Sequence, residues 1–387
     1  MVKTVANEIV QGISSHWRLR HRLTASSVLA LGLVSATVMP SRAAELWTGT
    51  NSTDWFDAGN WSAGVPSNAT STRIDTVAPN ATVIGAAGAQ STGLRVGVFG
   101  TGALTIQNGG TVNNTLGIIA DQLGSTGTAT VDGVGSAWTN SSDFYVGAGG
   151  NGMLTVSNGG SVSMVHGFIG NFAGSTGAVT VDGAGSSWNN SGDLQVSIFG
   201  NGTLNISNGG TVSNGLGYIA QYGATGAVTV DGAGSSWTNR NDLVVGGAYA
   251  AGTGTLTISN GGAVSVGGNS YLGDSVGATG TATVDGASSS WTNTGSLTVG
   301  NQGTGTLTVS NGGTVSASNM LIANTASSTG TLNIGAAFGL AAVGSGTLNT
   351  VSVDFGNGTG QIVFNHTDTN YIFTPTIGLP DNLYQTL

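Results

Sequence analysis

Hydrophobic and polar residues alternate over short stretches along most of the chain, and Gly, Asn, Asp and Ser separate these stretches. Two examples are Leu104-Thr105-Ile106, followed by a turn at Asn108-Gly109-Gly110, and Ala129-Thr130-Val131, followed by a turn at Asp132-Gly133. Alternation with a period of two predicts short β-strands joined by turns. The density of glycine and the β-branched residues exclude a helical reading of these stretches.

The alternating pattern itself repeats about every 50 residues. Val-Asp-Gly recurs ahead of Trp138, Trp188, Trp237 and Trp291, and Asn-Gly-Gly recurs at Asn108, Asn158, Asn208, Asn260 and Asn311. Each unit divides into two halves of about 25 residues, and each half contains three short strands. Such self-similarity predicts a solenoid. We expect an all-β, right-handed parallel β-helix with three strands per coil and about ten coils, on the order of 50 Å long.

Residues 44–90 differ from the repeats because Trp47, Trp55 and Trp61 crowd into them. A solenoid exposes its first core layer at its end, so we expect 44–90 to be an aromatic-rich cap. The alternative is a carbohydrate site built on exposed tryptophans. The repeats are expected over 91–335. Residues 336–387 are expected to be a further β segment that ends abruptly, as in a truncated chain.

The N-terminal residues 1–43 have the pattern of an extended signal peptide. Arg18, Arg20 and Arg22 precede an apolar stretch over 23–39, and cleavage is expected after Ala43. The alternative is an uncleaved membrane anchor, which the shortness of the stretch disfavours. We expect no membrane span in the mature chain, and a location in the periplasm, at the cell surface or outside the cell.

Charge excludes several classes of function. The chain of 387 residues has a net charge of −9, and beyond Ala43 the only Lys or Arg residues are Arg73, Arg95 and Arg240. Binding to nucleic acid through phosphate neutralisation is therefore not expected, and neither is a cationic site for an acidic polysaccharide. The chain has no cysteine, which suits a protein that crosses a membrane unfolded.

The repeated tryptophans admit a sugar-binding reading and a packing reading. Trp138 aligns with Val112 and Val162 of the neighbouring half-units, which predicts that the indoles point inward. Burial of such a ring contributes several kcal/mol at roughly 25 cal/mol per Å². On this reading Trp237→Ala should lower the melting temperature and Ser235→Ala should be mild.

The repeated acidic residues admit calcium binding or turn chemistry. Asp132, Asp182, Asp231 and Asp285 each precede Gly, where Asp accepts backbone N–H groups in a tight turn. The Asn-Gly turns should occupy nearly the same place in alternate coils, which separates these aspartates by two coils, about 9.6 Å.

A second set of acidic residues admits a catalytic reading. Asp143, Asp193 and Asp242 recur at one register, which would suit a carboxylate pair in a glycan-cleaving enzyme, but recurrence in every copy argues for structure. His166 and His366 look isolated. We therefore predict that the chain is not an enzyme and has no catalytic, cofactor-binding or metal-binding residues.

The paired half-units resemble a repeat shared by type V secretion autotransporter passengers and some PEP-CTERM proteins. The residues that carry the resemblance are Val181-Asp182-Gly183-Ala184-Gly185-Ser186-Ser187-Trp188 and Leu204-Asn205-Ile206-Ser207-Asn208-Gly209-Gly210, and registered copies cover 94–335. Such autotransporters carry a C-terminal membrane barrel and PEP-CTERM proteins a Pro-Glu-Pro anchor. Neither pattern occurs here, and the ending Asp381 to Leu387 suggests a truncated passenger.

The resemblance implies an exported, non-catalytic, adhesin-type surface protein. Its expected partners are host surface or matrix components, or other cells. Two alternatives stay open at this point. One is a β-helical protein that binds or cleaves glycans, and the other is a truncated product without an independent role.

Overall fold

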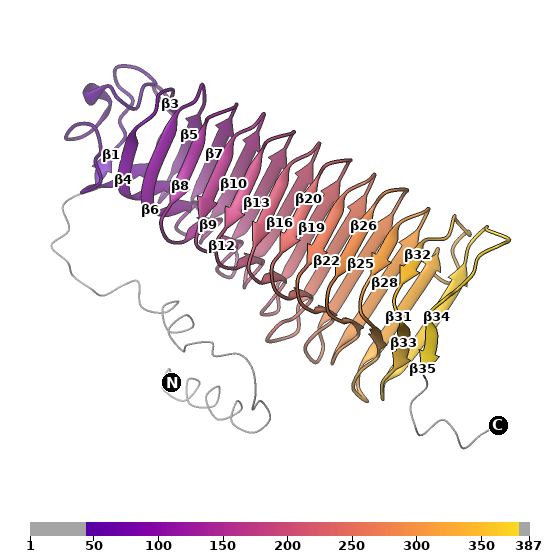
Figure 1. The fold of residues 1–387 in the computed structure, drawn as a ribbon. Coiled ribbons are helices and arrows are strands. Elements are labelled where there is room, and N and C mark those ends of the chain that lie inside the picture. The colour runs from indigo at the N-terminus through magenta and orange to yellow at the C-terminus, as the bar shows by residue number, and fades with distance from the viewer. Residues whose placement is uncertain (1–43, 379–387) are drawn as a thin grey trace, which may run out of the picture. The chain divides into compact units, whose positions relative to one another are not determined.

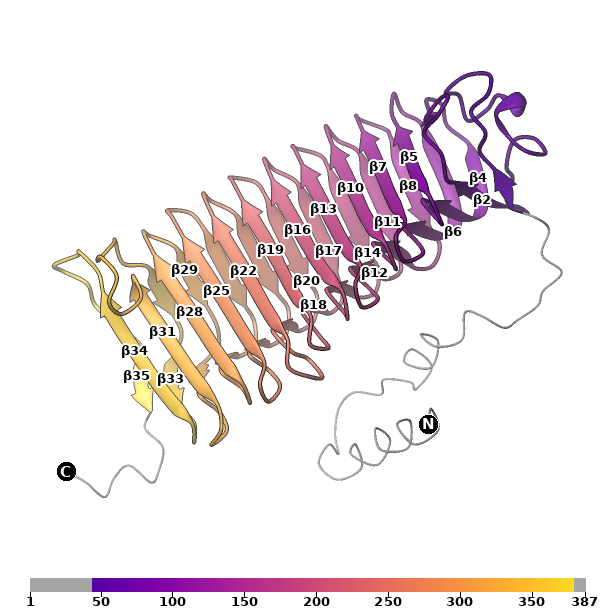
Figure 2. The same ribbon diagram turned by 180° about the vertical axis from the view of Figure 1, so that it is seen from behind.

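The computed structural model describes residues 44–378. The expected signal peptide over 1–43 and the chain end over 379–387 lie outside the described residues. Residues 44–378 form a rod of stacked β-coils, seen from two sides in Figure 1 and Figure 2. The predicted all-β parallel β-helix with about 25 residues per coil is confirmed, but the rod has about 13 turns where about ten were expected. The additional turns come from strands before residue 91 and after residue 335 that stack on the repeats.

One coil shows how the sequence pattern builds the rod. β13 (Thr176–Asp182), β14 (Ser187–Asn190) and β15 (Leu194–Val196) follow each other along the chain, separated by turns. β13 belongs to a sheet of twelve long strands, and β14 and β15 belong to a second sheet of short strands. Each strand pairs in parallel with its counterpart in the next coil, about 25 residues further along the chain. The inward side chains of each coil thus stack on those of the next.

The long strands form a single column in the order of the sequence. They are β3 (Thr82–Ile84), β5 (Thr101–Ile106), β7 (Thr126–Asp132), β10 (Asn151–Ser157), β13, β16 (Asn201–Ser207), β19 (Thr225–Asp231), β22 (Thr253–Ser259), β25 (Thr279–Asp285), β28 (Thr304–Ser310), β31 (Thr329–Gly335) and β34 (Thr359–Asn365).

The short strands form two further columns. The first holds β8 (Ala137–Asn140), β11 (Ser161–Met164), β14, β17 (Thr211–Asn214), β20 (Ser236–Asn239), β23 (Ala263–Val266), β26 (Ser290–Asn293), β29 (Thr314–Ser316) and β32 (Thr347–Asn349). The second holds β9 (Phe144–Val146), β12 (Gly167–Ile169), β15, β18 (Gly217–Ile219), β21 (Leu243–Val245), β24 (Ser270–Leu272), β27 (Leu297–Val299), β30 (Met320–Ile322), β33 (Ser352–Phe355) and β35 (Thr376–Gly378).

Near the N-terminal end of the rod, longer strands extend across both short-strand columns. β6 (Thr111–Ile119) pairs with β8 and with β9, and β4 (Ala89–Val96) pairs with β6 along its length. Before them lie β1 (Glu45–Leu46), a 3₁₀ turn, η2 (Ala58–Asn60), and β2 (Ser71–Ile74). No helix within residues 44–378 is long and apolar enough to cross a membrane.

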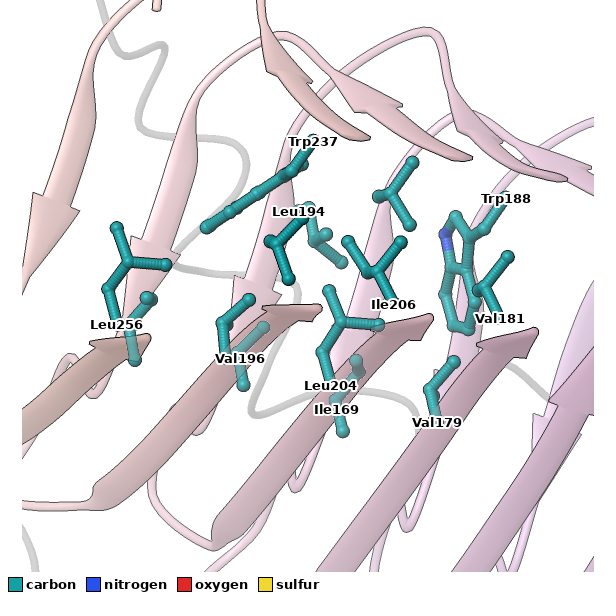
Figure 3. Packing of buried hydrophobic residues seen from close by; sticks show 14 of the residues in the cluster. Ile169, Val179, Val181, Trp188, Leu194, Val196, Leu204, Ile206, Trp237 and Leu256 are labelled. Atoms are coloured by element: carbon teal, nitrogen blue, oxygen red, sulfur yellow. The ribbon is translucent and has the colours of Figure 1, made fainter. Parts of the chain in front are cut away.

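The core between the sheets contains the repeated tryptophans. Trp138 lies in register between Val112 and Val162, as the alignment of half-units predicts. Trp138, Trp188, Trp237 and Trp291 are all fully buried, so the packing interpretation is confirmed. In Figure 3 the rings of Trp188 and Trp237 point from the short strands toward the leucines, isoleucines and valines of the long strands. Alternation of Trp with Val along the column lets each large ring pack beside a smaller side chain of the neighbouring coil.

The three N-terminal tryptophans bury one another at the start of the rod. Trp47 and Trp61 pack edge to face with centroids 4.9 Å apart, and Trp55 and Trp61 do so at 4.7 Å. The indole of Trp61 donates to the carbonyl of Trp55 at 2.7 Å. At most 5% of any of these side chains is exposed, so the reading of this segment as a carbohydrate site on exposed tryptophans is wrong.

Candidate functional site

The repeated aspartates join neighbouring coils. Asp182 Oδ1 accepts hydrogen bonds from Ser207 Oγ and from Asn208 Nδ2 in the next coil, both at 2.6 Å. The same pair of contacts, at 2.6–2.7 Å, is made by Asp132, Asp231 and Asp285. We call each such set an Asp clamp. Donors from the next coil therefore replace the expected backbone N–H groups of the aspartate's own turn, because the register places Asp182 beside Ser207.

The turns of neighbouring coils are joined by a second kind of contact besides the Asp clamp, and a serine side chain makes it. Asn208 has φ 52° and Gly209 has φ 88°, so both occupy the left-handed region that Asn and Gly tolerate. The backbone N–H of Gly209 donates to Ser235 Oγ of the next coil at 3.0 Å, and Ser235 Oγ donates to the carbonyl of Asp231 at 2.6 Å. Ser235 is buried. The expectation that Ser235→Ala is mild needs correction, because that change leaves a backbone N–H without its acceptor.

Buried asparagines satisfy the tryptophan indoles, a role that the sequence reading missed. Trp237 Nε1 donates to Asn214 Oδ1 in the preceding coil at 2.6 Å, and Asn214 Nδ2 donates to Asn239 Oδ1 at 2.7 Å. Val266 occupies the equivalent position two coils after Asn214. Trp291 Nε1 has no partner among residues 44–378, whereas Trp188, which has Met164 at the same position of the preceding coil, donates to Asn190 Oδ1 of its own strand at 3.0 Å. The alternation of inward residues contained this signal, because Asn214 lies two residues after the inward Val212.

The second set of acidic residues lies where the second short-strand column begins. Asp193 precedes β15 and Asp242 precedes β21, two coils further on, so the two carboxyl groups are about 9.6 Å apart along the rod. That separation is at the upper limit of the range for an inverting glycosidase and far above that for a retaining one. Asp193 Oδ1 accepts from Leu216 N at 2.9 Å, and Asp242 Oδ1 accepts from Asn269 N at 2.8 Å. These carboxylates therefore bind the backbone of the next coil.

The remaining member of that set contacts a histidine. Asp143 Oδ1 lies 3.0 Å from His166 Nδ1, and the Tyr145 hydroxyl donates to Asp143 Oδ2 at 3.4 Å. The hydrogen bond to Asp143 raises the pKa of His166 above its usual value, and burial raises the pKa of Tyr145. The reading of His166 as an isolated side chain is thus wrong. His366 packs beside Phe364 and Tyr371.

Aromatic rings stack between neighbouring coils, both on the second short-strand column and in the turns that follow its strands. Tyr145 and Phe168 are stacked with centroids 4.6 Å apart, and Tyr222 is stacked between Phe199, at 4.9 Å, and Tyr249, at 5.1 Å. A sugar ring that stacks on an aromatic side chain needs a free ring face. Both faces of Tyr222 are covered by neighbouring rings, so this stack joins adjacent coils and Tyr222 itself offers no free face to a sugar.

Within residues 44–378 no group of three or more His, Cys, Asp or Glu residues is placed to hold a metal ion. The described acidic residues that repeat along the chain instead have partners in neighbouring coils. The geometry therefore defines the class of this protein as a parallel β-solenoid whose repeated polar residues join its coils.

The chain has few matches among known proteins. No protein-family model matches the chain, and no curated protein matches it. Among solved structures, the chain is similar to a TibC-catalysed hyper-glycosylated fragment of TibA, residues 55–350 of that protein. The two are 20% identical with a TM-score of 0.27, and the match covers 79% of this chain and 97% of that fragment.

Proposed function

We propose that this protein is an exported, non-catalytic β-solenoid of the autotransporter-passenger type, which presents its outer faces at the cell surface. The observation that carries the proposal is that the repeated residues make contacts between neighbouring coils. Trp237, Asp182 and Ser235 each contact a neighbouring coil. The repeated Trp, Asp and Ser residues therefore hold a long rod together. A rod that exposes long faces is suited to adhesion or display.

The way the coils are joined also suits export. Each coil bonds to its neighbours through backbone ladders, Asp clamps reinforce every second junction between coils, and the chain has no cysteine that a disulfide would require. A solenoid folds by adding coils to those already formed. A chain that emerges from a membrane in extended form can fold in this way without any covalent link.

The arginines of the described residues are engaged within the protein, so the outer surface offers few free positive charges to a partner. Two of the three arginines in residues 44–378 pair with carboxylates, Arg73 with Asp75 and Arg95 with Asp121. The third, Arg240, donates to the carbonyl groups of Asn190 and Ser191, two coils earlier. This charge distribution disfavours nucleic acid, and the proposed partners remain host surface or matrix components, or other cells.

Export is tested by expressing the full chain in a Gram-negative host and sequencing the N-terminus of the extracted protein by mass spectrometry. The proposal predicts a mature chain that begins at Ala44, recovered outside the cytoplasm. The matched control carries Leu31→Arg and Leu33→Arg in the apolar stretch and should keep its N-terminus and stay inside. Recovery of the unmodified chain from the cytoplasm only, with an intact N-terminus, would contradict the proposal.

A further inference from the structure

Five turns of the rod share the sequence Asn-Gly-Gly and nearly the same backbone conformation. Their asparagines are all exposed, and each has a φ between 51° and 56°. They are Asn108, Asn158, Asn208, Asn260 and Asn311. The other Asn-Gly pairs of the chain lie in strands or in a turn of another conformation, so these five turns form a matched set.

An Asp clamp holds the asparagine side chain in four of the five turns. In every turn after the first, the asparagine Nδ2 donates to the clamp carboxylate at 2.6–2.7 Å. Asn108 differs, because Gly85 stands in the preceding coil where the other coils have the clamp aspartate. Gly85 offers no carboxylate to the Asn108 side chain.

The glycine that follows each asparagine is held in a similar way in all five turns. Its backbone N–H donates to a serine Oγ of the next coil at 3.0–3.2 Å in the first four turns. In the fifth turn it donates to the carbonyl of Ser345 at 2.8 Å. The clamp is therefore the contact that separates Asn108 from the other four asparagines.

Asn-Gly is the pair in which asparagine loses its amide group most readily, because glycine has no side chain to obstruct ring closure. The backbone nitrogen of the glycine bonds to Cγ of the asparagine, the Cγ–Nδ2 bond breaks, and Nδ2 leaves as ammonia with the proton of the glycine N–H. Water then opens the resulting succinimide ring to aspartate or isoaspartate. A clamped side chain must first leave its carboxylate, and hydrogen bonds to charged acceptors are the stronger ones.

We propose that Asn108 is a site of spontaneous deamidation and that the Asp clamps protect the other four turns from the same reaction. β5, which precedes Asn108, lies near the N-terminal end of the rod (Figure 1). The modification therefore adds a negative charge at one turn near that end, and its isoaspartate form lengthens the backbone of the turn. The clamps that join the coils thus also preserve the chain chemically.

The reaction is followed in the full chain, incubated in heavy-oxygen water at mildly alkaline pH, digested with pepsin in acid and analysed by peptide mass spectrometry. Heavy oxygen marks only the sites that react during the incubation. We expect Asn108 to react roughly tenfold or more faster than the four clamped asparagines, which is the factor that one hydrogen bond to a charged group contributes. In the chain unfolded by urea the five sites should react at similar rates, because the clamps are then absent.

Substitutions at the clamp position test the cause of the difference. Asp182→Ala removes one clamp and should speed the reaction at Asn208, while the other clamped sites stay slow. Gly85→Asp supplies a carboxylate beside Asn108 and should slow its reaction. Gly85 is exposed, and a Cβ placed there meets no atom within 4 Å. Gly85→Ala is the matched control, because it adds a side chain without a carboxylate, and it should leave Asn108 fast.

Far-UV circular dichroism and the melting temperature check the fold of each variant. Equal rates at Asn108 and at the clamped sites of the folded protein would overturn the proposal. So would an unreactive Asn108 in a folded chain whose urea-unfolded form reacts. An equal rate at Asn108 in Gly85→Asp and Gly85→Ala would overturn it as well, even if Asp182→Ala does not fold.

Discussion

Replacing a tryptophan by phenylalanine removes one indole N–H from the core, and the structure predicts opposite consequences at two sites. Trp237 and Trp291 are both fully buried at equivalent positions of two coils. Trp237 Nε1 donates to Asn214 Oδ1 at 2.6 Å, whereas Trp291 Nε1 has no partner among the described residues. Trp237→Phe therefore creates an unsatisfied buried acceptor, and Trp291→Phe eliminates an unsatisfied buried donor.

The magnitude follows from the cost of an unpaired buried polar group, about 1–3 kcal/mol. The loss of ring volume is the same in the two substitutions and cancels in the comparison. Trp237→Phe loses stability from an unpaired buried acceptor in addition to the loss from the smaller ring. Trp291→Phe loses only the ring volume and gains stability because it removes an unpaired buried donor. We expect the free energy of unfolding of Trp291→Phe to exceed that of Trp237→Phe by about 3 kcal/mol.

Urea denaturation followed by far-UV circular dichroism measures this difference. A second probe, intrinsic fluorescence, must give the same transition before a free energy is assigned, because solenoids can unfold in parts. A comparison of midpoints at constant slope then isolates the change in stability. Equal destabilisation by the two substitutions would refute the assignment of the indole partners.

Three further outcomes follow from the same contacts. Val266→Asn restores the missing indole acceptor and should be nearly neutral, whereas Val264→Asn, at an equally buried site of the same strand, should cost about 3 kcal/mol in thermal or urea unfolding. Ser235→Ala should cost about 2 kcal/mol in the same assay. NMR titration should give His166 a pKa above its ordinary value that Asp143→Asn lowers. The stability it contributes is complete below the ordinary pKa and is lost as the pH rises through the raised one.

The sequence was sufficient to predict the coil and its inward residues. Strict alternation fixes which side chains share a face, and the offset of about 25 residues aligned Trp138 with Val112 and Val162, as the structure has them. The number of turns was underestimated because the strands outside 91–335 stack in register although they lack the Trp and Asn-Gly markers.

The partners of the polar residues could not be predicted in the same way. The Asp clamp depends on Asp182 lying beside Ser207 and one residue away from the Asn-Gly turn, and such a one-residue offset is a property of the stacked backbone. Asn214 and Trp237 are 23 residues apart, in different coils. His166 likewise finds Asp143 only through coil stacking. Contacts between coils are set by three-dimensional register, which local patterns do not encode.

The coils of about 25 residues stack in one register, and a pair of introduced cysteines reports on that register. The chain has no cysteine of its own. Thr155 lies beside Thr180, with both side chains outward, so cysteines there should be within the 4.4–6.8 Å Cα separation of a disulfide. Cysteines at Thr155 and Ala178 should be about 8 Å apart, beyond that limit. Mild oxidation followed by peptide mass spectrometry should show the first pair linked and the second pair free, and the reverse result would contradict the register.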